Sequence, residues 1–162
     1  MKNNLSVRAF VLSTLFAIFA CSICAGGNIG RAKTVELKVK SVKINGYVGG
    51  RIDDCISHRV MEQDVDALVE PFRHRTETWR WQSEFWGKWT LGAIETYRYT
   101  GNAALYEKIA ASVGQIIETQ SPDGYIGNYA PEAQLKDWDI WGRKYTMLGL
   151  LSWYELSGDT RA

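Results

Sequence analysis

Apolar residues recur at the spacing of an α-helix along most of the chain after residue 60. The clearest stripe lies between residues 102 and 119 and consists of Leu105, Ile109, Val113, Ile116 and Ile117. Such a stripe predicts an amphipathic helix with one buried face. Gly101 and Asn102 stand just before it, and this pair is typical of a joint where one helix ends and the next begins.

Two longer helices are predicted, over residues 79–99 and 139–156, and both are rich in Trp, Tyr and Gly. They are apolar nearly all round, which is typical of helices that are covered on every side. We therefore expect them to be inner helices and the helix at 102–119 to be an outer one. The segment 120–130 contains Pro122, Gly124 and Gly127 and is predicted to be a loop.

The chain before residue 72 shows a different pattern. Val35, Leu37 and Val39 alternate with charged residues, and two Gly-containing pairs follow within residues 45–50. This predicts a short β segment and lead-in over residues 26–50. Apolar residues at helical spacing resume at 60–69 and predict a helix that Pro71 ends.

Residues 1–25 have the pattern of a secretory signal peptide. Lys2 and Arg8 precede an apolar run over residues 9–20, which is too short to span a bilayer, and small residues follow. We expect a secreted or periplasmic protein. A lipid anchor at Cys21 is the less favoured alternative, because Phe19 fits a lipoprotein signal poorly. If cleavage follows Ala25, Cys55 is the only cysteine left, and we expect it to be a small buried residue.

A twelve-residue segment occurs twice. Residues 91–102 return at an offset of 57 as residues 148–159, with Leu, Gly, Tyr and the late Gly identical. A repeat of this length fits one helical hairpin per unit. The predicted fold is therefore mainly α: a partial α/α six-fold barrel, which is a toroid of helical hairpins, over residues 51–162. Roughly six hairpins would close such a ring, so we expect this chain to be its incomplete N-terminal part.

Composition excludes some partners. The formal net charge is +1, and it becomes −1 without residues 1–25, since these hold two basic and no acidic residues. Nothing in this balance favours a nucleic-acid partner, and no membrane span is expected. No Cys-rich or His-rich metal site is apparent, so neither a metal nor another cofactor is predicted within this chain.

Three segments rich in aromatic and polar residues are candidates for a functional site: residues 79–89, 120–129 and 138–144. Two of them begin the inner helices and the third is the loop between, so in a ring of hairpins they share one rim. Sugars have apolar ring faces that stack on Trp or Tyr and hydroxyl edges that need polar groups. The predicted substrate-binding residues are Glu84, Trp86, Gln120, Asp123, Tyr125, Trp138, Asp139, Trp141 and Arg143.

Structural roles compete with these assignments. Trp79, Trp89 and Trp153 could pack between helices, Asp139 could cap a helix, and Asp123 with the following glycine could form a tight turn. Glycoside cleavage normally requires two carboxylic groups. Glu84, Asp123 and Asp139 are the carboxylates available at the predicted rim.

An ordered set of motifs resembles a known family. It comprises Gly50-Arg51-Ile52-Asp53, Pro71-Phe72-Arg73-His74-Arg75, Glu84-Phe85-Trp86-Gly87-Lys88-Trp89, Gln120-Ser121-Pro122-Asp123-Gly124-Tyr125-Ile126-Gly127 and the segment from Tyr154 to Gly158. Together they resemble the N-terminal part of glycoside hydrolase family 127, the β-L-arabinofuranosidase-like enzymes, over roughly residues 35–162.

The resemblance implies a retaining hydrolase of plant-type glycans with an α/α barrel followed by β-rich domains. It also implies a cysteine nucleophile near zinc, held by residues beyond position 162, so no catalytic residue is assigned here and the chain alone is expected to be inactive. Where described members carry a His-Glu pair, this chain has Trp138-Asp139. Two alternatives stay open: another α/α-barrel sugar enzyme, such as an unsaturated glucuronyl hydrolase or an epimerase, and a non-catalytic glycan-binding protein.

Overall fold

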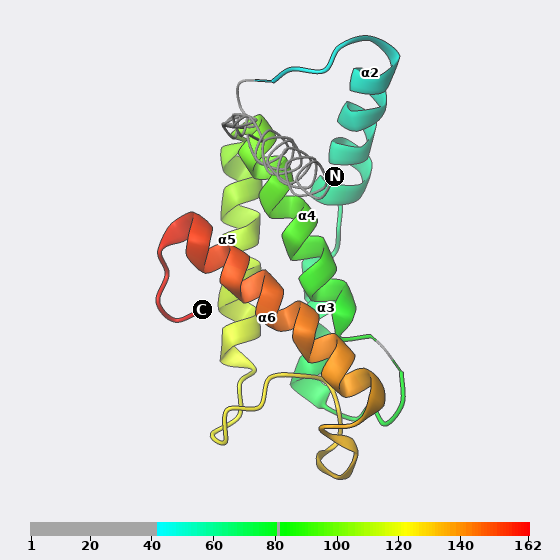
Figure 1. Cartoon of the computed structure of the whole chain (residues 1–162), viewed down its shortest axis with the longest axis vertical. Helices are drawn as coiled ribbons and strands as arrows, with labels where there is room; N and C mark the ends of the chain where they lie inside the picture. Colours follow the sequence, from blue (N-terminus) through cyan, green and yellow to red (C-terminus); the bar gives the residue numbers. More distant parts are fainter. Residues whose placement is uncertain (1–41, 81) are drawn as a thin grey trace, which may run out of the picture. The chain divides into compact units, whose positions relative to one another are not determined.

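The structure is a computed structural model and describes residues 42–80 and 82–162 (Figure 1). The predicted signal peptide, Cys21 and the alternating residues 35–39 lie outside the described residues. The described elements are α2 (Gly46–Cys55), the π-helix η2 (Ile56–Met61), α3 (Val65–His74), α4 (Glu84–Thr100), α5 (Ala103–Glu118), the 3-10 helix η3 (Pro131–Ala133) and α6 (Asp137–Ser157).

The described part is mainly helical, as the sequence predicts. Its β structure is a single parallel bridge between Glu77 and Tyr129. The helices of residues 42–162 do not by themselves close a ring, so the toroid stays a prediction.

The sequence predicts a β segment and lead-in up to residue 50, and this prediction is wrong for residues 46–50. Residues 46–50 are the first turns of α2, and the expected boundary at residue 50 falls inside this helix. Glycine is needed at position 49 because α2 lies close to the preceding chain, and not because a turn is formed. A Cβ atom at this position would overlap the carbonyl group of Ile44. The glycine pairs therefore allow a helix to begin against the preceding chain.

The helix expected to end at Pro71 continues through it. α3 begins at the N-cap Asp64, whose side chain accepts a hydrogen bond from the amide of Ala67 at 3.0 Å. Pro71 lies inside α3, and the helix ends at Arg75, which adopts a left-handed conformation with φ of 50°. Proline removes one backbone hydrogen bond, but the buried Phe72 anchors the turn that follows it.

The sequence predicts a joint between two helices at Gly101 and Asn102, and the structure confirms it between α4 and α5. Gly101 ends α4 in the left-handed conformation, with φ of 65°. The Asn102 side chain then accepts hydrogen bonds from the amides of Ala104 and Leu105, at 2.9 and 3.3 Å. The same joint recurs at Gly158, which ends α6 with φ of 75°. The repeat therefore reproduces the helix end that the sequence indicates.

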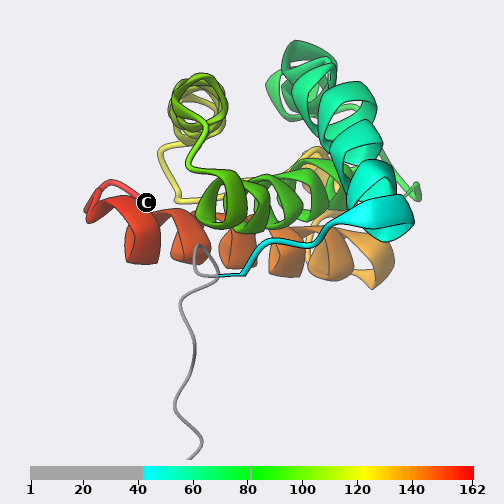
Figure 2. The same cartoon turned by 90° about the horizontal axis from the view of Figure 1, so that it is seen from above.

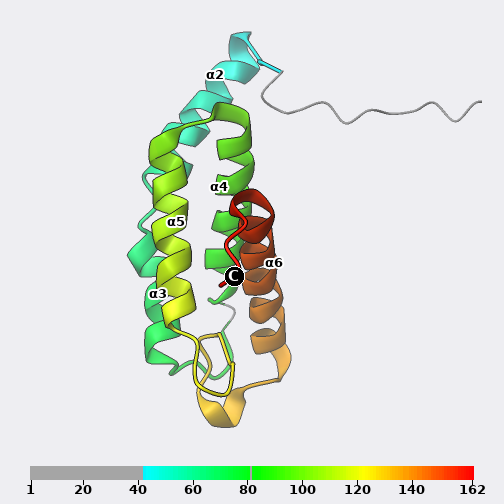
Figure 3. The same ribbon diagram turned by 90° about the vertical axis from the view of Figure 1, so that its left-hand side faces the viewer.

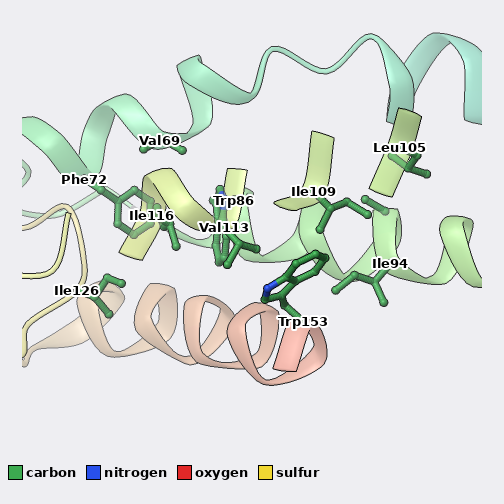
Figure 4. Close-up of a cluster of buried hydrophobic side chains, with 11 residues drawn as sticks. Val69, Phe72, Trp86, Ile94, Leu105, Ile109, Val113, Ile116, Ile126 and Trp153 are labelled. Carbon is green, nitrogen blue, oxygen red and sulfur yellow. The ribbon is translucent and has the colours of Figure 1, made fainter. Parts of the chain in front are cut away.

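α4 is the central helix of the described part. Seen from above and from the side, it lies between α6 on one side and α3 and α5 on the other (Figures 2 and 3). The core fills the space among these helices (Figure 4). Its buried apolar residues are Val69, Phe72, Trp86, Ala93, Ile94, Leu105, Ile109, Val113, Ile116, Ile126 and Trp153. The predicted stripe of α5 supplies four of them.

Glycines bring α4 and α6 into close contact. A Cβ atom at Gly87 would overlap the backbone carbonyl of Tyr145, and one at Gly142 would overlap the Ser83 side chain. Farther along, a Cβ at Gly149 would stand 3.0 Å from the Trp86 ring. The starts of the two helices therefore meet, and both helices run in the same direction (Figure 1).

The two copies of the repeat occupy different surroundings. Gly149 packs on α4, whereas Gly92, its equivalent, is exposed and a Cβ atom there would meet nothing within 4 Å. The outward face of α6 is likewise exposed, with Leu148 at 40% and Leu151 at 51% exposure. In the described part, α6 is therefore not covered on all sides, contrary to the expectation for an inner helix.

We predict that Gly87→Ala lowers the free energy of unfolding by about 2 kcal/mol, because the added methyl group forces the two backbones apart. Gly92→Ala is the matched control. It has open space and should leave stability unchanged or raise it by up to about 1 kcal/mol through helix propensity. Urea unfolding followed by circular dichroism measures both. Equal effects of the two substitutions would contradict the close contact.

Candidate functional site

The three segments predicted to share a rim meet at one end of the helices. α4 and α6 begin at this end, and the loop between α5 and α6 passes beside them (Figure 1). The Trp141 indole nitrogen donates a hydrogen bond to the Glu84 carboxylate. The Tyr125 hydroxyl donates to Asp139 Oδ1 at 2.8 Å. The structure therefore joins the first segment to the third and the loop to the third.

A small open pocket lies at this rim. It has a volume of about 500 Å³ and is lined by Trp79, Asp137, Trp138 and Trp141. Trp79, Trp138 and Trp141 are 62%, 44% and 39% exposed, respectively. The rings of Trp138 and Trp141 are nearly perpendicular, with their centroids 6.1 Å apart. A pocket with exposed aromatic walls and one carboxylate can hold a ligand that has both apolar faces and hydrogen-bonding groups.

The backbone before α6 is shaped to present Asp137 and Trp138. Leu135 and Asp137 both adopt left-handed conformations, with φ of 64° and 43°. The Leu135 amide donates to Asp139 Oδ2 at 2.7 Å, which ties this turn to the first turn of the helix. Such conformations are uncommon outside glycine and often occur at functional sites.

Trp141 is held in place by charged neighbours. Its indole nitrogen bonds Glu84, which also accepts a hydrogen bond from Lys88 at 2.8 Å. That hydrogen bond raises the pKa of the Lys88 ammonium. The Lys144 ammonium lies 3.5 Å from the centroid of the Trp141 ring, within cation–π range. One edge and one face of Trp141 are thus engaged by the protein.

Tyr125 is the centre of a second, buried group of residues. Its hydroxyl donates to Asp139 and accepts a hydrogen bond from the Tyr129 amide at 3.0 Å. The guanidinium carbons of Arg75 and Arg143 lie 5.6 and 5.2 Å from its ring centroid. Burial, and then the hydrogen bond to Asp139, raise the pKa of Tyr125. This group joins the loop to α3 and α6.

Asp139 and Glu84 are both buried, at 0% and 5% exposure. Asp139 is not an N-cap, because it stands inside the first turn of α6 and accepts hydrogen bonds from Tyr125 and the Leu135 amide. Their hydrogen bonds occupy these two carboxylates inside the protein, so Asp137 is the carboxylate that lines the rim pocket.

Gln120 and Asp123 serve the loop itself. The Gln120 amide donates to the carbonyl of Gly124 at 3.1 Å. Asp123 accepts hydrogen bonds from the Ser121 hydroxyl at 2.5 Å and from the Tyr125 amide at 3.2 Å. These bonds, led by that from Ser121, lower the pKa of Asp123. Both side chains are exposed and neither lines the rim pocket, so the tight-turn interpretation of Asp123 is the one the geometry supports.

Trp86 belongs to the core and does not reach the rim. It lies among the buried apolar side chains (Figure 4) and is 0% exposed. Its indole nitrogen donates to the Ser112 hydroxyl at 2.8 Å. The expectation that Trp86 contacts a sugar is therefore wrong. Its place follows from helix periodicity, because position 86 points toward α5 whereas its neighbour Phe85 is 45% exposed.

Two residues that line the pocket and one that supports it are not among the residues that the sequence predicts. Packing between helices is only one of the roles that the sequence allows for Trp79, and in the structure it is the most exposed tryptophan of the pocket. Asp137 lines the pocket where the sequence predicts Asp139. The signal in the sequence is a pair of carboxylates two positions apart at the start of a helix. Arg75 beside Tyr125 carried no signal, because it contacts a ring 50 residues away in the sequence.

Residues 42–80 and 82–162 contain no group of three or more His, Cys, Asp or Glu side chains placed to hold a metal ion. Cys55, expected to be buried, is an exposed free thiol. The difference arises because α2 buries only Gly49, so this helix offers Cys55 no core to enter. Within the same described ranges, no helix is both long and apolar enough to cross a membrane.

Comparison with known proteins gave no match: no family model fits the chain, and no curated protein and no solved structure is significantly similar to it. The family resemblance of the motifs therefore stays a prediction.

We predict that Tyr125→Phe lowers the free energy of unfolding by about 1 to 3 kcal/mol, since it removes a partner of the buried Asp139 carboxylate and an acceptor of the Tyr129 amide. Tyr47→Phe is the matched control, because Tyr47 is 84% exposed. Chemical denaturation of both variants gives the comparison. A Tyr125→Phe protein as stable as the control would show that the buried group contributes nothing.

A second prediction concerns alkaline pH. Burial raises the pKa of Tyr129 to about 12, above the value of about 10 expected in the unfolded chain. The unfolded state then releases this proton first, so the stabilisation is complete below pH 10 and is lost as pH rises toward 12. Unfolding measured between pH 9 and 12 should show a shallower decline for Tyr129→Phe than for the unaltered protein. Parallel curves would contradict this assignment.

Proposed function

We propose that this chain binds carbohydrate at the rim pocket, as the N-terminal part of an exported glycoside hydrolase of the β-L-arabinofuranosidase-like kind. One observation supports the proposal above the others. Three exposed tryptophans and the Asp137 carboxylate line one pocket at the start of α6. Sugar rings can stack on the tryptophans, and sugar hydroxyl groups can donate hydrogen bonds to Asp137.

The rim residues fall into two groups in this proposal: those that contact the sugar and those that hold the contact residues in place. Trp79 and Trp138 provide stacking surfaces, and Asp137 accepts hydrogen bonds from hydroxyl groups. Trp141 forms the third wall and is fixed by Glu84. The Tyr125 group lies behind this surface and holds the loop against α6. Arg143 and Asp139 thus act as positioning residues in this proposal.

The proposal assigns binding, and not bond cleavage, to the described rim. Cleavage by the common mechanism needs two carboxylic groups that flank the glycosidic bond. Glu84 and Asp139 are occupied by internal hydrogen bonds. This favours, as a second candidate, a glycan-binding protein without catalysis. In either case the family resemblance supports the choice of arabinofuranosyl glycans as the first ligands to test.

The test measures binding of arabinofuranosyl oligosaccharides to the full chain by isothermal calorimetry and tryptophan fluorescence. Trp138→Ala and Asp137→Asn should each weaken binding at least tenfold, about 1.4 kcal/mol. Asn also tolerates the left-handed conformation of position 137, so the second variant changes the charge and keeps the backbone. Phe85→Ala is the matched control, because Phe85 is exposed on α4 and does not line the pocket.

The outcomes separate the candidates. Saturable binding that both pocket variants weaken and the control retains supports the proposal. Stronger binding of oligosaccharides that end in an unsaturated uronic acid would favour the alternative class of α/α-barrel enzyme. No binding of either sugar, or binding that Asp137→Asn and Trp138→Ala leave unchanged, would overturn the site.

A further inference from the structure

Trp79 is the wall of the rim pocket that packing holds least. It is 62% exposed and lies in a bend between α3 and α4. The Arg80 guanidinium lies 5.6 Å from its ring centroid, but Arg80 belongs to the same bend, so this contact does not tie the ring to the rest of the fold. A sugar that must first immobilise a side chain binds more weakly. The order of Trp79 therefore depends on what holds its backbone.

A single carboxylate oxygen holds the backbone around Trp79. Glu77 Oε1 accepts hydrogen bonds from three successive amides, those of Thr78, Trp79 and Arg80, at 2.9, 3.1 and 3.1 Å. Successive amides that converge on one anion form a nest. Burial by itself would raise the pKa of Glu77, but the three amide hydrogen bonds outweigh it and lower that pKa. Glu77 is therefore ionised at neutral pH, and its charge strengthens all three hydrogen bonds.

The same residue ties the bend to the loop before α6. The Glu77 amide donates to the carbonyl of Asn128 at 3.1 Å, and its carbonyl accepts from the amide of Ala130 at 2.9 Å. These two bonds form the parallel bridge to Tyr129. The Tyr129 hydroxyl donates to the carbonyl of Arg80 at 2.8 Å, and Tyr129 is 1% exposed. The backbone on both sides of the bend is thus anchored on a buried residue.

We propose that Glu77 is a positioning residue of the rim pocket, whose carboxylate fixes the backbone at Trp79 so that the indole ring is held ready to stack on a sugar. This inference rests on the proposed carbohydrate site and adds to it a residue outside the pocket lining. Glu77 acts on binding through Trp79, so its effect disappears when the ring is absent. A residue that only stabilises the fold would weaken binding whether or not Trp79 is present.

The first experiment is a double-mutant cycle that measures binding of an arabinofuranosyl oligosaccharide to the full chain by isothermal calorimetry. Glu77→Ala should raise the dissociation constant roughly fivefold, because the ring must then be ordered on binding. In a Trp79→Ala background the same change should cause no further loss. Glu132→Ala is the matched control, since Glu132 is exposed in η3 and does not line the pocket. Equal losses with and without Trp79 would overturn the proposal.

Glu77→Gln is the conservative variant. Its side-chain carbonyl can still accept hydrogen bonds from the amides, but without the charge that strengthens them. Its dissociation constant should therefore lie between those of the unaltered protein and Glu77→Ala. A Glu77→Gln protein that binds no better than Glu77→Ala would contradict the role of the amide nest.

The second experiment needs no sugar, so it separates failure of this proposal from failure of the carbohydrate site. The full chain is labelled with 5-fluorotryptophan, and Trp79→Phe identifies the fluorine resonance of position 79. Glu77→Ala should shift and sharpen this resonance, because the exposed ring becomes mobile. The resonances of the buried Trp86 and Trp153, identified in the same way, should stay in place and show that the core is intact.

The outcomes of this second experiment are distinct. A response of the Trp79 resonance without any sugar binding would leave Glu77 as the positioning residue and overturn only the choice of ligand. A Trp79 resonance that Glu77→Ala leaves unchanged would overturn the proposal. If Glu77→Ala does not fold, the same comparison is made with Glu77→Gln, and an unchanged resonance in that variant overturns the proposal equally.

Discussion

The close contact between α4 and α6 is the constraint on which the rest of the described structure depends. It exists because Gly87 and Gly142 leave room for the opposite backbone and the Ser83 side chain. The short distance between the helices lets Trp141 form a hydrogen bond with Glu84. The position of this pocket wall therefore depends on the absence of a side chain at Gly87 and at Gly142. Any change that widens this contact would also move Trp141 away from Glu84.

Aromatic residues have two distinct duties in this chain, and burial separates them. Trp86 and Trp153 complete the core between α4, α5 and α6. Trp79, Trp138 and Trp141 instead stand at the end of the helices with much of their rings in solvent. Trp138, Trp141 and Trp153 all belong to α6, so this one helix carries members of both sets. Tryptophan residues in this part of the chain therefore contribute both to the core and to the exposed surface of the pocket.

Local signals in the sequence were sufficient for much of the fold. The α5 stripe and the Gly101-Asn102 joint depend on neighbouring residues alone, and both were correctly predicted. The start of α2 and the passage of α3 through Pro71 were not, because they depend on contacts with Ile44 and with the core around Phe72. Helix periodicity also could not show that the two copies of the repeat differ in what covers them.

The candidate site was predictable as a region and not residue by residue. The sequence placed the right segments at one rim, but Trp86 and Trp79 exchanged roles, since Trp86 lies on the inward face of α4 whereas Trp79 lies in a bend before that helix. Asp137 adds a consequence for how such a pocket can change over time. Its backbone has φ of 43°, which Asp, Asn and Gly tolerate best. A single nucleotide exchange converts an Asp codon to either of the others, so mutation can alter the charge of the pocket in one step while its shape is conserved.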